Sequence, residues 1–252
     1  MDHKENWISY SGKMDDKPAD FYVDLGLGPV APVSTMPNFL CVSLDLNEEG
    51  EDGLPTEREY VAILNVEAAL VESLKRNHSA IYAGRVVADG LLDFYFYTAG
   101  TLLIDKTISE SMVAFPGYNY DYILGEDKDW QRFFEDLYPN AGEFRSFMNK
   151  KVIENLEGIG DDLSRPRGVD HWIFFRSPEG REQYIEKVKE KGFTIEHASI
   201  SDRGDGLMYA LQISRVDKVD YEHIEGFVHY LWELAKELDG DYDGWGTYVE
   251  LE

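Results

Sequence analysis

The feature that most constrains the fold is an alternation of two hydrophobic periods in the last third of the chain. Apolar residues repeat at every second position over 207–213, a spacing that predicts a half-buried strand. They repeat at every third or fourth position over 222–238, a spacing that predicts a helix packed on a core. The expected order is strand, helix, two strands, helix and strand, over about 171–175, 178–191, 193–200, 207–213, 222–238 and 242–250.

Local signals mark the ends of the two helices in this region. Ser177 followed by Pro178 gives an N-cap and a proline at the first helical position. Gly192 is a C-terminal stop for the same helix. Asp220 is placed to cap the second helix. These signals support the βαββαβ order, which is typical of a ferredoxin-like domain.

The same order of elements is expected over residues 38–125. Thr56 and Glu59 form a capping box at the start of a long helix. Asp89-Gly90 is a strong hairpin signal between two strands. The remaining elements follow from alternating or helical spacing, with strands near 40–46, 81–88, 91–98 and 118–124 and a weaker second helix near 101–112.

These patterns predict an α+β protein of two ferredoxin-like βαββαβ domains, joined by helices and a short linker. Glycine, proline and charged residues cluster over 158–168, where we expect the linker. The expected domains are therefore 1–158, an N-terminal α+β domain with trailing helices, and 169–252.

Charge excludes several classes of protein. The 252 residues carry 24 Lys and Arg against 49 Asp and Glu, a net charge of −25. Such a chain lacks the clustered cations that contact phosphates, so we expect neither direct nucleic-acid binding nor docking on an anionic membrane. The single cysteine, Cys41, lies in an apolar run and indicates a buried thiol. With no apolar signal core near its start, the chain is expected to be cytoplasmic.

No motif indicates catalysis. The six histidines form no HExxH pattern, and His223 and His229 lie on different faces of their helix. Gly26-Leu27-Gly28 is followed by Pro29 rather than by a helix, so it does not indicate a phosphate-binding loop. We therefore expect no catalytic residue, no metal ligand and no cofactor.

One segment matches a calcium-binding pattern. Residues 239–244 read Asp-Gly-Asp-Tyr-Asp-Gly, and Glu250 stands at the spacing of the last ligand in an EF-hand loop. An EF-hand also needs a helix after that glutamate, and the alternation at 245–250 instead favours a strand. We expect a helix stop followed by a strand, with a calcium-dependent module as the alternative.

The C-terminal part resembles a known family. Residues 241–250, Asp-Tyr-Asp-Gly-Trp-Gly-Thr-Tyr-Val-Glu, are very similar to the closing motif of the regulator of ribonuclease E activity B (RraB) family. The resemblance covers residues 169–252 and includes the helix at 178–191 followed by Gly192-Phe193. It implies an acidic, ferredoxin-like, non-catalytic protein whose namesake binds the regulatory half of ribonuclease E and restrains RNA cleavage.

The N-terminal part resembles a second family. Residues 5–140 are similar to the uncharacterised domain of unknown function 695 family, for which no activity is established. The residues that carry the likeness are Trp7, Tyr10, Gly53-Leu54-Pro55-Thr56, Glu59, Glu67, Trp130 and Tyr138-Pro139.

Together these features predict a non-enzymatic, acidic regulatory protein that modulates RNA turnover. Its expected partner is a basic protein, either a ribonuclease or another RNA-handling protein, to which the negative charge steers it. Aromatic residues of the closing motif are expected as anchors beside acidic residues. The expected partner-binding residues are Tyr242, Asp243, Trp245, Tyr248, Glu222 and Glu225.

An alternative function stays open for the N-terminal domain. The aromatic stretches Phe94–Tyr97 and Tyr118–Tyr122 are compatible with a pocket for a small ligand or an enzyme substrate. In that case the C-terminal domain is an accessory module. The sequence does not predict the oligomeric state.

Overall fold

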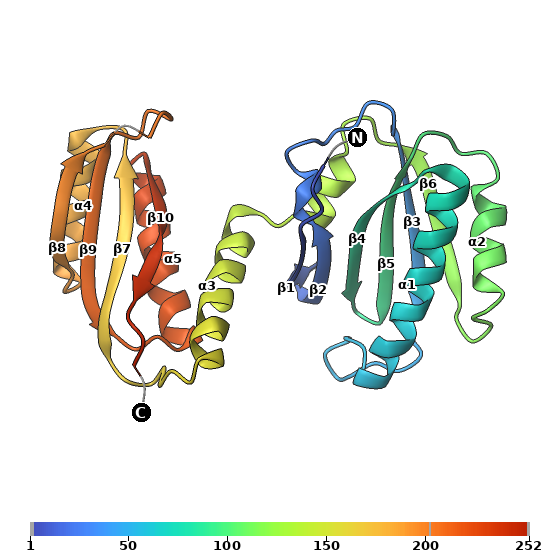
Figure 1. The fold of residues 1–252 in the computed structure, drawn as a ribbon, viewed down its shortest axis with the longest axis horizontal. Helices are drawn as coiled ribbons and strands as arrows, with labels where there is room; N and C mark the ends of the chain where they lie inside the picture. Colours follow the sequence, from blue (N-terminus) through green and yellow to red (C-terminus); the bar gives the residue numbers. More distant parts are fainter. Residues whose placement is uncertain (1–2, 202, 251–252) are drawn as a thin grey trace. The chain divides into compact units, whose positions relative to one another are not determined.

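The structure, a computed structural model, describes residues 3–201 and 203–250. The chain divides into two compact units, Met1–Glu143 and Phe144–Glu252, called here the N-terminal and C-terminal units. Each unit has its own sheet and its own core (Figure 1).

The N-terminal unit is built on a six-stranded sheet in which all neighbouring strands are antiparallel. The strand order is β1-β2-β4-β5-β3-β6. The last four strands in this order form the predicted βαββαβ arrangement, and β1 and β2 extend it at one edge (Figure 1). The strands are β1 (Trp7–Met14), β2 (Lys17–Asp24), β3 (Asn38–Asp45), β4 (Ile81–Ala88), β5 (Leu91–Thr98) and β6 (Tyr120–Glu126).

Two helices cover one face of this sheet, α1 (Glu57–His78) and α2 (Ile104–Met112). Half of the predicted capping box forms, because the Thr56 side chain accepts a hydrogen bond of 3.2 Å from the Glu59 amide. The other half does not form, since the Thr56 amide donates to the Glu48 carbonyl and the Glu59 carboxylate accepts from the Asn47 amide. Apolar residues of both helices share one core with the inward residues of β3 and β5. Two short helices, η1 (Leu25–Leu27) and the π-helix η2 (Phe133–Leu137), complete the unit.

The C-terminal unit is built on a four-stranded antiparallel sheet with the order β10-β7-β9-β8. This order confirms the ferredoxin-like prediction for the region. The strands are β7 (Arg167–Phe175), β8 (Thr194–Ile200), β9 (Tyr209–Asp217) and β10 (Gly240–Thr247), and the helices are α3 (Ala141–Gly158), α4 (Pro178–Glu190) and α5 (Tyr221–Glu237).

Helices α4 and α5 lie on one side of the four-stranded sheet (Figure 1). Both begin at the predicted caps: the Ser177 side chain accepts from the Gly180 amide at 3.1 Å, and the Asp220 carboxylate accepts from the His223 amide at 3.1 Å. Gly192, just past the end of α4, has φ +82°, a backbone conformation that suits glycine.

The boundary between the two units lies within helix α3 rather than at the glycine- and proline-rich stretch 158–168. Ile153 and Leu156 of α3 are buried in the core of the C-terminal unit. The stretch 158–168 therefore lies inside that unit, as the connection between α3 and β7. The breaker residues that indicated a linker form a tight loop instead.

Two further expectations concern single features. Cys41 is buried in β3, as the apolar run around it predicted. Within the described ranges, no helix has the length and apolar composition needed to span a bilayer.

Candidate protein-docking face

The closing motif forms strand β10, whose residues alternate between the two sides of the sheet. Tyr242 pairs with Ile173 and Trp245 with His171, and these side chains face the helices. Gly244 and Gly246 stand on the outward side. The register shifts between Tyr242 and Gly244, and the extra residue there is Asp243.

The inward side of the motif belongs to the core. Tyr242 is 2% exposed, and its hydroxyl shares a 2.7 Å hydrogen bond with Nδ1 of His171. Trp245 is half-buried, and its indole Nε1 donates to Oδ1 of Asn149 on α3 at 2.9 Å. Tyr242, which we expected to bind a partner, is therefore buried, because the strand register turns its ring toward the helices.

The outward side carries a surface that we call the open face: Gly168, Asp170, Trp172 and Phe174 of β7, Val216 of β9, and Tyr248. The Trp172 ring lies over Gly246, where an added Cβ would come within 3.2 Å of the indole. Trp172 is 37% exposed and Val216 is 68% exposed. Gly246 thus leaves room for an aromatic side chain from the neighbouring strand.

Tyr248 belongs to the same surface. Its ring lies 3.9 Å from the position a Cβ would occupy at Gly168, and it is 57% exposed. Thr247, the preceding residue, is tied to β7 because its hydroxyl donates to the Gly168 carbonyl at 2.8 Å. The open face therefore combines two exposed aromatic rings, each beside a glycine.

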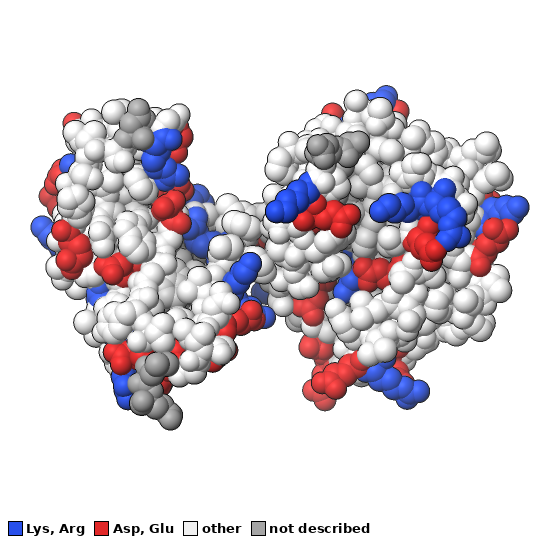
Figure 2. Space-filling model, in the orientation of Figure 1, with Lys and Arg blue, Asp and Glu red and all other residues white. Residues whose placement is uncertain are grey.

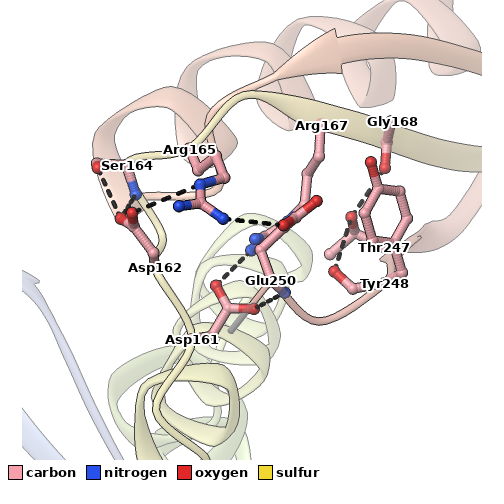
Figure 3. Close-up of polar contacts among 9 residues, drawn as sticks. All are labelled: Asp161, Asp162, Ser164, Arg165, Arg167, Gly168, Thr247, Tyr248 and Glu250. Atoms are coloured by element: carbon pink, nitrogen blue, oxygen red, sulfur yellow. Dashed lines mark hydrogen bonds and ion pairs between the residues drawn. The ribbon is translucent and has the colours of Figure 1, made fainter. Parts of the chain in front are cut away.

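A buried ion pair holds the segment that carries Tyr248. Arg167 donates from Nη2 to Oδ1 of Asp161 at 2.6 Å, and both side chains are wholly buried (Figure 3). Nε and Nη1 of Arg167 have no hydrogen-bond partner among the described residues. A buried pair of this kind leaves a costly unpaired charge when one partner is removed.

The same aspartate fixes the chain after β10. Its Oδ2 accepts from the Glu250 amide at 2.8 Å, and the Asp162 amide donates to the Glu250 carbonyl at 2.9 Å (Figure 3). Arg165 adds a contact of 3.3 Å to Oε2 of Glu250. We call Asp161, Arg167 and Glu250 the Asp161 clamp. It joins the loop before β7 to the segment after β10, and so it positions Tyr248.

Asp170 is a charged member of the open face, and further charges lie at its margin. Figure 2 shows mainly uncharged atoms over the sheet of the C-terminal unit, with charged side chains toward its margins. Asp170 accepts from Gln212 at 3.1 Å. Arg203 lies 4.4 Å from the centre of the Phe174 ring and pairs with Asp241 and Asp243 at 3.4 and 3.6 Å. The expected residue Asp243 is exposed and belongs to this margin.

The two expected glutamates lie elsewhere, on helix α5. Glu222 is exposed in the first turn. Glu225 accepts from the Ser146 hydroxyl and from Nδ2 of Asn149 at 2.9 Å, so it joins α5 to α3. The structure therefore brings only Tyr248 and Asp243 of the six expected residues to the open face or its margin.

Sequence reasoning missed Trp172 and Phe174. The run 171–175 is apolar at both its odd-numbered and its even-numbered positions, so its spacing does not predict which side chains face the helices. In the structure Val169 and Ile173 are buried against the helices, so Trp172 and Phe174 lie on the outward side. The signal that was present is Gly246 in β10, since a glycine within a strand can mark a place where a neighbouring side chain approaches the backbone.

Most of the residues that match the calcium-binding pattern form a strand in the structure. Residues 240–247 are strand β10, and Asp241 and Asp243 pair with Arg203. Among residues 3–201 and 203–250, no three histidine, cysteine or acidic side chains are grouped so that they hold a metal ion.

The fold and this surface define a class: an α+β protein of two ferredoxin-like units, the second of which presents an aromatic sheet face. The family model described as a family of unknown function (DUF695) matches residues 5–138, and the chain belongs to that family. The model described as regulator of ribonuclease activity B matches residues 147–247. Both resemblances predicted from the sequence are confirmed.

A curated relative supports the second match. A protein named regulator of ribonuclease activity B from Shewanella denitrificans is 25% identical over 101 residues, which are 40% of this chain and 78% of the relative. An unknown protein from Galdieria sulphuraria has a TM-score of 0.24 at 10% identity, with 82% of this chain and 96% of that one covered. A putative glycine cleavage system transcriptional repressor has a TM-score of 0.27 at 6% identity, with 85% and 99% covered. Both scores are too low to bear on fold or function.

Proposed function

We propose that this protein is a non-enzymatic regulator of ribonuclease activity, which binds a basic protein partner through the open face of its C-terminal unit. The similarity of residues 147–247 to regulators of ribonuclease activity B supports the type of function. The open face supports the mode of action. We propose the cytoplasm as the location, in agreement with a single cysteine that is buried and unpaired.

The observation that carries the proposal is the placement of Trp172 and Tyr248. Both rings are exposed on one sheet face, and the strand register and the Asp161 clamp hold the backbone under them. Tryptophan and tyrosine are enriched among the residues that dominate protein–protein binding energy. Rings held on a strand also lose little conformational entropy on binding.

Charge favours a basic partner over a neutral one. The net charge of −25 attracts a cationic segment from a distance, and this attraction weakens as salt is added. At the face itself, Asp170 stands two positions from Trp172 on the same side of β7. A lysine or arginine of the partner is able to contact the carboxylate and the indole together. Basic segments of RNA-handling proteins also bind RNA, so the protein would compete with RNA for them.

The test measures binding and cleavage with a purified ribonuclease from the same cells. We expect the double substitution Trp172→Ala and Tyr248→Ala to weaken binding by about tenfold or more, since each truncation removes a ring from the centre of the interface. Inhibition of RNA cleavage should weaken in parallel. Wild-type binding should also weaken as salt is raised from about 50 to 300 mM.

A matched control comes from the helix side of the same unit. Tyr221 on α5 is 46% exposed, and Tyr221→Ala should leave the dissociation constant within about twofold of wild type. Circular dichroism establishes that all variants are folded. Wild-type affinity of the double variant would rule out the open face as the docking site.

A further inference from the structure

The N-terminal unit contains a cavity that the proposed function does not use. It has a volume of about 400 Å³ and lies on the sheet face opposite α1 and α2. Outward residues of β3, β5 and β6 form its floor, and the segment 126–136 forms a wall. This volume is within the range of small-molecule sites. The lining residues used below are Phe39, Cys41, Ser43, Asp93, Tyr95 and Asp136.

Tyr95 supplies a hydroxyl group to the lining of the cavity. The residue is 5% exposed, and among the described residues its hydroxyl has no hydrogen-bond partner. Its charged neighbours Asp93, Asp136 and Arg132 also line the cavity. Since Tyr95 lines the cavity and no protein group bonds to its hydroxyl, that oxygen is available to a ligand that enters.

Asp93 supplies a carboxyl group without a cationic partner. It accepts from the Ser43 hydroxyl at 2.5 Å, and among the described residues no lysine, arginine or histidine pairs with it. Burial raises the pKa of Asp93, and hydrogen bonds from Ser43 and Cys41 offset part of that rise. A positive charge placed beside a partly buried carboxylate stabilises its ionised form.

The other charged groups of the cavity already have partners. Asp136 pairs with Arg132 at 3.1 Å. Asp127 accepts from the Tyr97 hydroxyl at 2.7 Å and from the amides of Gln131 and Arg132. Asp93 and Tyr95 are therefore the groups left to meet a ligand.

We propose that this cavity binds a small organic cation, such as a primary amine. Its ammonium group donates to the Asp93 carboxylate and to the Tyr95 oxygen, and its apolar body packs on the Phe39 ring. Phe39 and Tyr95 already form a tilted pair with centroids 5.5 Å apart, which gives the cation an aromatic wall. The inference stands apart from the proposed function, because the C-terminal unit takes no part in it.

A binding titration with the full chain tests the proposal. The probes are butylamine, 1,4-diaminobutane and 2-phenylethylamine, each with the neutral alcohol of the same shape, followed by NMR chemical-shift changes. We expect at least one amine to bind with shifts at Phe39, Ser43 and Ile123, and its alcohol to bind at least about tenfold more weakly. Absence of amine binding at millimolar concentration, or equal binding of the alcohol, would overturn the proposal.

Two substitutions locate the site. Asp93→Asn keeps the shape of the side chain and should weaken amine binding by about tenfold or more. Tyr95→Phe removes only the hydroxyl and should weaken it about three- to tenfold. Asp105→Asn, at an exposed carboxylate on α2, is the matched control and should change nothing. If Asp93→Asn does not fold, Tyr95→Phe decides alone, and wild-type affinity in a folded variant of either residue contradicts the proposal.

Discussion

At the scale of single residues, the core of the C-terminal unit contains a neutral histidine. Burial, with a smaller contribution from the charge of Arg215, lowers the pKa of His171 to about 3. Its Nδ1 is bonded to Tyr242, and its Nε2 has no partner among the residues described. Tyr242, which the sequence suggested as an anchor for a partner, instead hydrogen-bonds to one nitrogen of this imidazole.

This histidine makes stability depend on pH. In the unfolded chain its pKa is near 6.5, so between pH 6.5 and 3 the unfolded state binds a proton that the folded state excludes. The free energy of unfolding should therefore fall as pH decreases from 6.5, by up to about 1.4 kcal/mol per pH unit from this group. Urea unfolding at pH 7, 6 and 5 measures the slope.

We expect His171→Gln to lose this part of the slope, because glutamine does not titrate. His197→Gln, at an exposed position on β8, is the control and should keep the wild-type slope. Identical slopes for wild type and His171→Gln would show that His171 is not a buried neutral imidazole.

At the scale of elements, the capping residues predicted where the helices begin. The caps at Thr56, Ser177 and Asp220 were readable because each satisfies helix amides within three residues. The hairpin of β1 and β2 was missed because its turn is formed by Asp15 and Asp16, both with positive φ, rather than by glycine.

The open face was only partly predictable for a related reason. When a strand is apolar at both odd-numbered and even-numbered positions, its sequence does not predict which of its sides is covered. Long-range packing decides this, as it does for Trp172, which is exposed, and for its neighbours His171 and Ile173, which are buried.

The Asp161 clamp gives a prediction at this scale. Asp161→Asn leaves the Arg167 charge buried without a carboxylate, and we expect the free energy of unfolding to fall by about 3–5 kcal/mol. Chemical denaturation measures the loss. Glu154→Gln, at an exposed carboxylate of α3, should cost less than about 0.5 kcal/mol. Equal costs for the two substitutions would mean that the pair contributes no more than a surface contact.

At the scale of the whole molecule, the chain combines two ferredoxin-like units with different surfaces. The C-terminal unit presents exposed rings on a sheet face, and the N-terminal unit covers part of the equivalent face with residues 126–136 to form a cavity. The order of elements predicted the shared fold, since periodicity and caps are local. The use of each sheet face depends on segments outside the βαββαβ pattern, and spacing alone does not place them.

The central claim is that a ribonuclease docks on the open face, and hydrogen–deuterium exchange with and without the bound enzyme tests it most directly. We predict slower amide exchange in β7, β10 and residues 247–250 of the complex, with helix α5 around Glu222 unchanged. Protection confined to α5, or to the N-terminal unit, would contradict the account.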